Sequence, residues 1–374
     1  MNRKVKRVFN GGLVAAILLL CLTSCKNSDT NSEIIIGIAW PFESDQSLFE
    51  EGIDMAVEDI NKEGGIRGQK LVLLKLDDTS EVTTGMAAAK KLTENSSVKA
   101  VIGHKSSYIS IPASAIYEEA GLIMLSPSST SPELTKDGGG TTFRMIPSDE
   151  VIAWRVAKYL SDNDYKKIVL YYTEDSYGKG LADAFEDQAG QYGITIIDRF
   201  NNYLGTEELQ RQERKWRAFG YDGFFVAASV ADGSKFIYDV SQAGIEGIFV
   251  GGNALDNASF MEEAGINKEH IVIGSVFDPE GNTVAESYIQ KFTERYGQTP
   301  DIYSVLGYDS VKILSDALSN TSNYDRNEIA SELIKLSKWT GVCGEHEISE
   351  NGDDIGDLVV IKELRDGIFS RLER

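Results

Sequence analysis

The chain has 374 residues, of which 42% are hydrophobic and 25% are charged. That balance is typical of a globular protein, and the length predicts two domains rather than one. The formal net charge of −21 repels phosphate backbones, so we expect no nucleic acid partner. Three histidines and three cysteines are too few and too scattered for a zinc site or a disulfide framework, and we expect neither a metal nor a cofactor.

The N-terminus has the composition of an export signal. Residues 1–7 are basic, and residues 13–22 form an unbroken apolar run. A membrane-spanning helix needs about 20 apolar residues, so this run is too short to remain in a bilayer. A basic start followed by a short apolar run and small residues predicts a secretory signal peptide over residues 1–24.

The end of that signal is more specific. Residues 22–25, Leu-Thr-Ser-Cys, resemble the lipobox of bacterial lipoproteins, which implies that Cys25 is acylated and becomes the first residue of the mature chain. Polar residues 25–32 would then form a tether, and acyl chains on Cys25 would hold the protein at a membrane surface. Cys343 is then the one unmodified cysteine, and we expect it to be a small buried side chain without a disulfide partner.

From residue 33 onward, short β-branched runs alternate with amphipathic segments. The predicted strands are residues 34–39, 71–76, 100–103, 122–126, 168–172, 194–199, 223–228, 247–251 and 271–275. Apolar residues recur at helical spacing over 48–62. Strands that are almost entirely apolar and alternate with helices predict parallel sheets covered on both faces. The expected fold class is therefore α/β, with two doubly wound parallel sheets.

The two rounds of this pattern divide near residues 143–148, after four strands of the first round. Ser148 is a good N-cap candidate for a helix that opens the second round. After residue 275 the chain becomes mainly helical, over 284–296, 303–319 and 326–338, and two short strands close it, 358–362 and 367–371.

Two serine-rich loops follow predicted strands. In open α/β sheets, ligands bind beside the carboxyl ends of the strands. Ser107 follows the third strand at the N-cap position of the next helix, and residues 128–130 follow the fourth strand. Hydroxyls and free backbone N–H groups at such positions can bind a carboxylate without a charged residue. Each loop alone could be an ordinary cap or turn, but the pair on neighbouring strands favours a binding site.

Other polar and aromatic residues leave alternatives open. Trp40 and Tyr177 follow strands, where they could either line a pocket or pack in the core. Asp77 and Asp78 indicate a turn with helix capping more than a pair of catalytic carboxylates. Residues 138–140 lack the Lys-Ser/Thr of a phosphate-binding loop. Because the sequence also lacks a G-x-S-x-G motif and its histidines are far apart, we expect no enzyme activity.

The order of several short motifs is more specific than any one of them. These motifs occupy residues 56–68, 77–78, 101–104, 106–107, 112–121, 125–135, 143–144, 177–180 and 307–310. In this order, from residue 34 to the C-terminus, the chain resembles the type I periplasmic solute-binding proteins. Within them it resembles the leucine/isoleucine/valine-binding branch that serves ABC importers.

This resemblance implies two doubly wound lobes joined by a hinge of three chain crossings, with a solute bound between the lobes. The crossings are expected near residues 147–149, 276–279 and 340–344. Lobe 1 would comprise residues 33–148 plus 277–339, and lobe 2 residues 149–276 plus 340–374. The lobes close over the solute, and permease subunits of an ABC importer recognise the closed form. The resemblance thus implies a location outside the cytoplasm, at a bacterial membrane.

The resemblance also implies roles for individual residues. Ser107 matches a serine that binds the solute carboxylate. Ser128 and Thr130 match the pair that holds the carboxylate and the ammonium, and Tyr177 matches a tyrosine that covers the solute. Asn253 stands where the branched-chain binders have a glutamate that pairs with the ammonium.

Asn253 leaves two hypotheses for the cargo, because a buried ammonium needs an anion beside it. Either a nearby acid substitutes, among Glu43, Asp45, Asp175, Asp232 and Asp256, or the solute carries a carboxylate and no amine. We expect a small carboxylate-bearing solute, with an amino acid as the first candidate. The alternative function is a ligand-sensing module of the same fold that reports to a membrane signalling partner.

Overall fold

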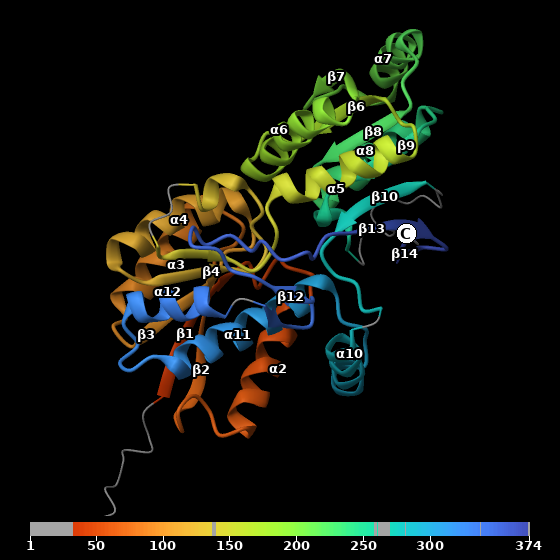
Figure 1. Cartoon of the computed structure of the whole chain (residues 1–374). Helices are drawn as coiled ribbons and strands as arrows, with labels where there is room; N and C mark the ends of the chain where they lie inside the picture. The colour runs from red at the N-terminus through yellow and green to blue at the C-terminus, as the bar shows by residue number, and fades with distance from the viewer. Residues whose placement is uncertain are drawn as a thin grey trace, which may run out of the picture.

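The computed structural model describes residues 33–136, 140–257, 260, 270–280, 282–336 and 338–372. The predicted signal peptide, the acylation site Cys25 and the tether lie outside these residues. The described chain forms two large β-sheets with helices on both faces of each, and a two-stranded sheet (Figure 1).

The first large sheet has five parallel strands in the order β2-β1-β3-β4-β5. These strands are β1 (Glu33–Trp40), β2 (Lys70–Asp77), β3 (Val98–Gly103), β4 (Ile123–Ser126) and β5 (Thr142–Arg144). One face is covered by α2 (Phe49–Lys62), α11 (Ile302–Asn320) and α12 (Arg326–Lys335). The other face is covered by α3 (Val82–Glu94) and α4 (Ser107–Ala120). The inner strands are apolar on both sides because both faces of the sheet are buried.

The second large sheet has seven strands in the order β14-β13-β10-β9-β8-β6-β7. They are β6 (Lys167–Tyr172), β7 (Thr195–Phe200), β8 (Gly223–Ala227), β9 (Ile248–Gly251), β10 (Ile271–Ser275), β13 (Val360–Arg365) and β14 (Ile368–Arg371). Helices α5 (Asp149–Asp162) and α6 (Ser176–Gln191) cover one face. Helices α7 (Gly205–Phe219) and α8 (Val230–Gln242) cover the other.

The remaining elements lie in the connections. They are the short 3₁₀ helices η1 (Pro132–Leu134) and η2 (Asn253–Leu255), the helix α10 (Thr283–Tyr296), and the hairpin of β11 (Trp339–Thr340) and β12 (Glu345–His346). Helix α10 packs beside α2, where the Tyr296 hydroxyl donates to the Glu51 carbonyl at 3.1 Å. One apolar core continues through the connections, because Ile146, Val276 and Val342 are buried together with side chains of α5, α6, α10 and α11.

The predicted α/β class with doubly wound parallel sheets is confirmed. Two details differ from the prediction. The first sheet has a fifth strand, β5, which the sequence analysis did not predict and whose Arg144 lies opposite Ser126 of β4. The second sheet is also not wholly parallel, since β13 runs antiparallel to β10 and to β14. The turn between β13 and β14 has positive φ at Asp366 and Gly367, which favours a tight hairpin and therefore an antiparallel pair.

Two predicted helix caps also differ in detail. Helix α4 begins at Ser107, so the N-cap position belongs to Ser106 and Ser107 is the first helical residue. Ser148 does occupy the N-cap position of α5, but its side chain makes no capping hydrogen bond. The hydroxyl of Ser107 is thus directed to another group, which is described below.

The segment 345–354, which the sequence analysis assigns to the second lobe, packs against the first sheet. The Arg144 N–H donates to the Gly352 carbonyl at 2.9 Å, and Ile348 is buried in the core of the five-stranded sheet. Gly352 has φ +88°, and a Cβ on it would lie 2.2 Å from the Thr142 carbonyl oxygen. A glycine is needed here because this segment runs directly along the edge strand β5.

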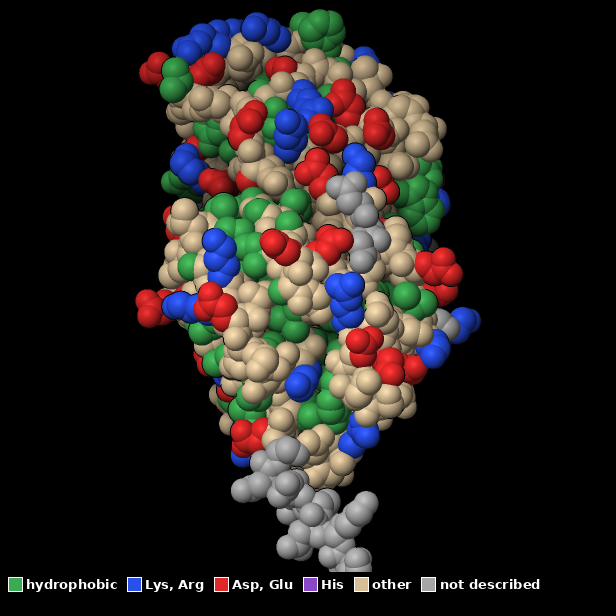
Figure 2. Space-filling view, turned by 90° about the vertical axis from the view of Figure 1, so that its left-hand side faces the viewer, with side chains coloured by type: hydrophobic (Ala, Val, Ile, Leu, Met, Phe, Trp, Pro, Cys, Tyr) green, Lys and Arg blue, Asp and Glu red, His purple; other side chains and the backbone are tan. Residues whose placement is uncertain are grey.

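Acidic and basic side chains are intermixed over the whole face of the molecule that Figure 2 displays. Because basic side chains lie among the acidic ones, they reduce the repulsion between acidic side chains that a net charge of −21 implies. Within the part of the chain that the structure describes, no helix combines the length and the apolar character that crossing a bilayer requires.

Candidate solute-binding site

Ser107, Ser128 and Thr130 lie in neighbouring loops at the carboxyl ends of β3 and β4. The Ser107 hydroxyl accepts a hydrogen bond from the Ser131 N–H at 3.3 Å, and the Ser128 hydroxyl donates to the Lys105 carbonyl at 2.7 Å. Thr130 is fully buried, and its hydroxyl has no hydrogen-bond partner among the described residues. The fold therefore brings the two serine loops into direct contact and leaves the Thr130 hydroxyl available for a ligand.

Tyr177 and Asn253 form a second group, on the other sheet. Tyr177 lies in the first turn of α6, whose N-cap Asp175 accepts two backbone N–H groups at 2.9 and 3.0 Å. The Tyr177 hydroxyl donates to Asn253 Oδ1 at 3.5 Å and accepts from the Ala254 N–H at 3.4 Å. Burial raises the pKa of Tyr177, so its hydroxyl remains protonated and available as a donor at neutral pH.

Asp149, the first residue of α5, lies between these two groups. Its N–H donates to the Thr130 carbonyl at 2.9 Å, and its Oδ2 is 3.2 Å from the point where a Cβ on Gly180 of α6 would lie. The side chain is fully buried, and neither carboxylate oxygen has a hydrogen-bond partner among the described residues. Burial raises the pKa of Asp149 to about 7, although the Thr130 hydroxyl and the Arg144 cation both act to lower it. A cation placed beside this carboxylate would remove the free-energy cost of its burial.

None of the five acids named above as substitutes for the missing glutamate is both buried and unpaired. Asp45 binds a lysine ammonium at 2.6 Å, and Asp256 binds another at 2.9 Å. Asp175 caps α6. Glu43 and Asp232 are exposed to solvent. Asp149 differs from these five acids in being both fully buried and without a hydrogen-bond partner among the described residues, and the sequence analysis did not name it as a substitute.

Trp40, which the sequence leaves open as pocket wall or core residue, is only 1% exposed. Its ring stacks on Phe49, with centroids 3.6 Å apart. Beside it, the Lys105 ammonium lies 4.5 Å from the centre of the Tyr303 ring and 2.6 Å from Asp45 Oδ1. Trp40 thus packs in the core of the first sheet. Its neighbour Lys105 contacts the second serine loop, because the Lys105 carbonyl accepts the Ser128 hydroxyl.

Two buried histidines lie beside carboxylates, and the first of them, His104, belongs to the loop between β3 and α4. Asp78 lies 2.7 Å from His104 Nδ1, and its other oxygen accepts the Ser80 N–H at 3.1 Å. Asp77 accepts the N–H groups of Glu43 and Thr79. Both aspartates therefore make the turn contacts that their position in the sequence indicates, and Asp78 adds a buried hydrogen bond with His104.

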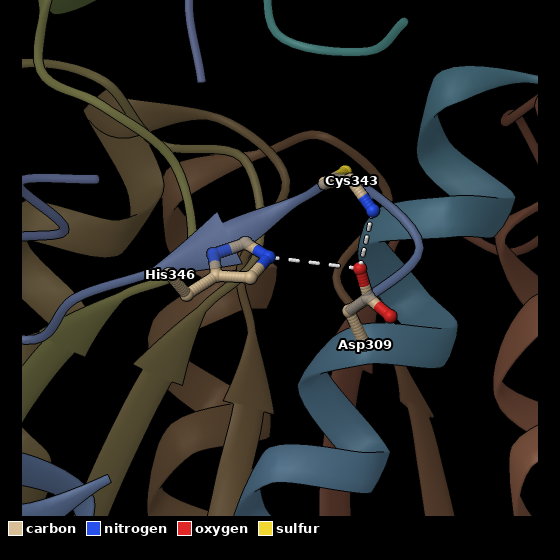
Figure 3. Close-up of side chains that lie close together, drawn as sticks. All are labelled: Asp309, Cys343 and His346. Carbon is tan, nitrogen blue, oxygen red and sulfur yellow. Dashed lines mark hydrogen bonds and ion pairs between the residues drawn. The ribbon is translucent and has the colours of Figure 1, made fainter. Parts of the chain in front are cut away.

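Asp309, Cys343 and His346 form the second histidine cluster (Figure 3). The Asp309 carboxylate accepts the N–H groups of Val342 and Cys343 at 2.9 and 2.8 Å, and His346 lies between Asp309 at 3.6 Å and Asp354 at 2.6 Å. Burial acts to lower the pKa of His346, but the two carboxylates outweigh it and raise the pKa to about 9. These contacts tie the chain at 342–346 to α11, with the His346 ring held between two buried carboxylates.

The sequence contains only weak signals for three residues near the candidate site that the sequence analysis did not identify, Asp149, Ser131 and Tyr303. An acid in the first turn of a helix is common, because it interacts favourably with the helix dipole, so Asp149 looks like an ordinary helix start. Ser131 and Tyr303 have no pattern of their own. Their contacts become visible only when the fold places Ser131 beside Ser107 and Tyr303 beside Lys105.

The profile of the periplasmic binding protein family matches residues 33–361. The match covers most of the chain, so the chain belongs to this family of solute-binding proteins, and the resemblance predicted from the sequence is confirmed.

Individual relatives agree with that assignment. An ABC transporter substrate-binding protein from Desulfitobacterium hafniense, solved in complex with Leu, is 45% identical, with a TM-score of 0.85 and coverage of 91% of this chain and 100% of its own. The branched-chain amino acid transporter substrate-binding protein from Streptococcus pneumoniae, solved with isoleucine, is 25% identical, with a TM-score of 0.81 and coverage of 91% and 98%. An amino acid binding protein from Pseudomonas aeruginosa is 28% identical over 98% of this chain and 99% of its own length.

Proposed function

We propose that this protein captures an amino acid with an apolar side chain, leucine in the first instance, and delivers it to an ABC importer. The loops at Ser107 and at residues 128–130 would bind the carboxylate through hydroxyl and N–H groups. Tyr177 would cover the solute from the other sheet. The leucine and isoleucine complexes of its relatives support this class of cargo.

The observation that carries the proposal is the buried, unpaired carboxylate of Asp149 beside the unpaired hydroxyl of Thr130. A carboxylate and a hydroxyl acceptor together suit an ammonium group, whose three N–H donors need partners. Asp149 would then supply the negative charge that Asn253 does not. This favours an amine-bearing solute over a plain carboxylic acid.

The two sheets with their helices would act as the two lobes, and the solute would bind where α6 approaches the serine loops. We propose crossings near residues 145–149 and 276–282. Because 345–354 packs on the first sheet, the third crossing is better set at 355–359 than at 340–344. Closure of the lobes over the solute would present the loaded form to the permease.

We further propose that acylation of Cys25 anchors the protein at the outer side of a bacterial membrane. The experiment compares the full chain with the Cys25→Ala variant and with Cys343→Ala as the matched control. Acyl anchoring predicts that only Cys25→Ala moves from the membrane fraction to the soluble fraction. If that variant sediments with membranes as the parent does, the anchor is elsewhere.

Calorimetry with leucine and with 4-methylpentanoate, which has the same carbon skeleton without the amine, tests the proposed cargo. Breaking a buried charge pair costs about 3–5 kcal/mol, so the deaminated acid should bind about 100-fold more weakly or worse. The Asp149→Asn variant should lose most of that preference. Equal affinity of the native protein for both compounds would contradict the pairing of Asp149 with an ammonium.

A further inference from the structure

Arg144 is the largest charged side chain in the interior of the first sheet, and it is fully buried. It belongs to β5, directly opposite Ser126, the last residue of β4. Its guanidinium donates to the carbonyls of Ser129 and Ser131 at 3.2 and 2.9 Å. These two carbonyls belong to the residues on either side of Thr130.

Two carbonyls held by one rigid guanidinium fix the orientation of the peptide groups between them, because the planar fork leaves little freedom. Thr130 is the residue so fixed. Its carbonyl accepts the Asp149 N–H at 2.9 Å, and its unpaired hydroxyl lies beside the Asp149 carboxylate. Arg144 therefore acts on both groups of the candidate ammonium site without reaching into it.

The other side of the guanidinium contacts a distant part of the chain. Arg144 Nε lies 2.8 Å from Asp353 Oδ1, and the Thr135 hydroxyl donates to the same oxygen at 2.6 Å. Asp353 belongs to the segment that runs along β5 and continues to β13 of the second sheet. The serine loop is thus linked through one side chain to the chain segment that leads from one sheet to the other.

The charges around Arg144 are compatible with this role. Burial lowers the pKa of Arg144, and Asp353 and Asp149 oppose that change. The pKa of Asp149 responds to the Arg144 cation, the acids Asp175 and Glu150 and the Thr130 hydroxyl, and Asp149 in turn acts on Tyr177. Of these groups Arg144 is the cation, and it favours the ionised carboxylate that an ammonium requires.

We propose that Arg144 is a positioning residue of the solute site, which holds the Thr130 loop and couples it through Asp353 to the segment leading to the second sheet. This inference rests on the proposed function, because it concerns the same site. In this role Arg144 acts through the carbonyls that flank Thr130 and through Asp353, rather than by contact with the solute.

The test measures leucine affinity by calorimetry in the full chain carrying Arg144→Lys, Asp353→Asn, or Arg217→Lys. Arg217 pairs with Glu213 within α7, on the face of the second sheet opposite α6, and serves as the control for loss of an arginine–carboxylate pair remote from the loop. Lysine keeps the charge but cannot bridge two carbonyls and a carboxylate, so Arg144→Lys should weaken leucine binding about 10- to 100-fold. Asp353→Asn should weaken it about three- to tenfold, and Arg217→Lys should leave it unchanged.

A double-mutant cycle separates positioning from general destabilisation. If Arg144 acts through Thr130, the effect of Arg144→Lys on leucine affinity should shrink at least about threefold in a Thr130→Val background. Additive effects, or native affinity in both Arg144→Lys and Asp353→Asn, would overturn the proposal. Should Arg144→Lys fold poorly, Asp353→Asn still decides the question.

The outcomes also separate this inference from the proposed function. If the native protein binds no leucine, or if Asp149→Asn leaves the preference for the amine intact, the proposed function fails. If those two results are as expected and only the Arg144 and Asp353 variants behave like the native protein, the positioning role alone fails.

Discussion

At the scale of single residues, the decisive feature is the buried carboxylate of Asp149, whose charge the Thr130 hydroxyl and the Arg144 cation stabilise only in part. The fold places Asp149 in the interior without a hydrogen-bond partner among the described residues, an arrangement that costs stability. Such a cost is common at binding sites, where a ligand supplies the missing interaction. The ionised carboxylate of Asp149 should therefore lower the free energy of unfolding of the protein without solute and raise its affinity for a solute that carries an ammonium group.

Replacing Asp149 by Asn should stabilise the empty protein at high pH while weakening leucine binding. An aspartate in an unfolded chain ionises near pH 3.8, whereas burial raises the pKa of Asp149 to about 7. Between these values the native state binds the extra proton, so native stability falls as pH rises, and the penalty is complete above pH 7. It amounts to about 4 kcal/mol. Asp149→Asn should gain that amount in urea unfolding at pH 8 and less at pH 5.

An exposed acid provides the control for this measurement. Asp232→Asn should change the free energy of unfolding by less than about 0.5 kcal/mol at either pH. A gain for Asp149→Asn that is the same at pH 5 and pH 8 would show that the carboxylate is not the source of the penalty.

The two hydroxyls on the serine loops should respond differently to removal. Thr130→Val removes an unpaired hydroxyl, so the empty protein should keep its stability within about 1 kcal/mol while leucine affinity falls about tenfold. Ser107→Ala leaves the Ser131 N–H without its acceptor and should cost about 1–2 kcal/mol of stability as well as affinity. Thermal unfolding and calorimetry on both variants check this. Unaltered leucine binding in the Thr130→Val, Ser107→Ala double variant would remove these loops from the site.

At the scale of elements, α6 is the helix that approaches the serine loops from the second sheet. A Cβ on Gly180 would lie 3.2 Å from Asp149 Oδ2 and 3.5 Å from Ser131 Oγ, whereas a Cβ on Gly190 of the same helix would meet nothing within 4 Å. The two glycines differ only in what lies opposite them. They therefore form a matched pair for testing whether α6 must approach Asp149 closely.

Gly180→Ala should weaken leucine binding on the order of fivefold, because a methyl group crowds the carboxylate and the loop. Gly190→Ala should leave leucine affinity unchanged. Both should stabilise the helix itself by about 0.5–1 kcal/mol, since alanine is the better helix former. Calorimetry and thermal unfolding of the two variants provide the comparison, and equal leucine affinity in both would argue against a close approach of α6 in the bound state.

At the scale of the whole molecule, the two sheets share one continuous core. Ile146, Val276 and Val342 in the connections are buried together with side chains of α5, α6, α10 and α11, and the ion-paired group of Asp309 and His346 ties a connection to α11. Unfolding of one sheet would expose apolar surface of the other. The two halves should therefore unfold together despite the size of the chain.

Calorimetric unfolding of the protein should accordingly give one transition, and leucine at 100 times its dissociation constant should stabilise the whole by about 2.7 kcal/mol. Two transitions, of which leucine shifts only one, would show that the halves unfold independently and that the solute binds to one of them alone.

The amino-acid sequence by itself determines the alternation of strands and helices, the doubly wound class and the family, because local apolar periodicity and a long ordered set of motifs carry that information. It also identifies Ser107, Ser128 and Thr130 as neighbours, since parallel strands end at one edge of a sheet. Only the tertiary structure decides that Trp40 packs in the core, that residues 345–354 lie along β5, and that Asp149 and Arg144 act on the Thr130 loop. The physical reason is that burial and the absence of a partner are properties of contacts between distant segments. The same Asp149 at the start of an exposed helix would only interact with the helix dipole.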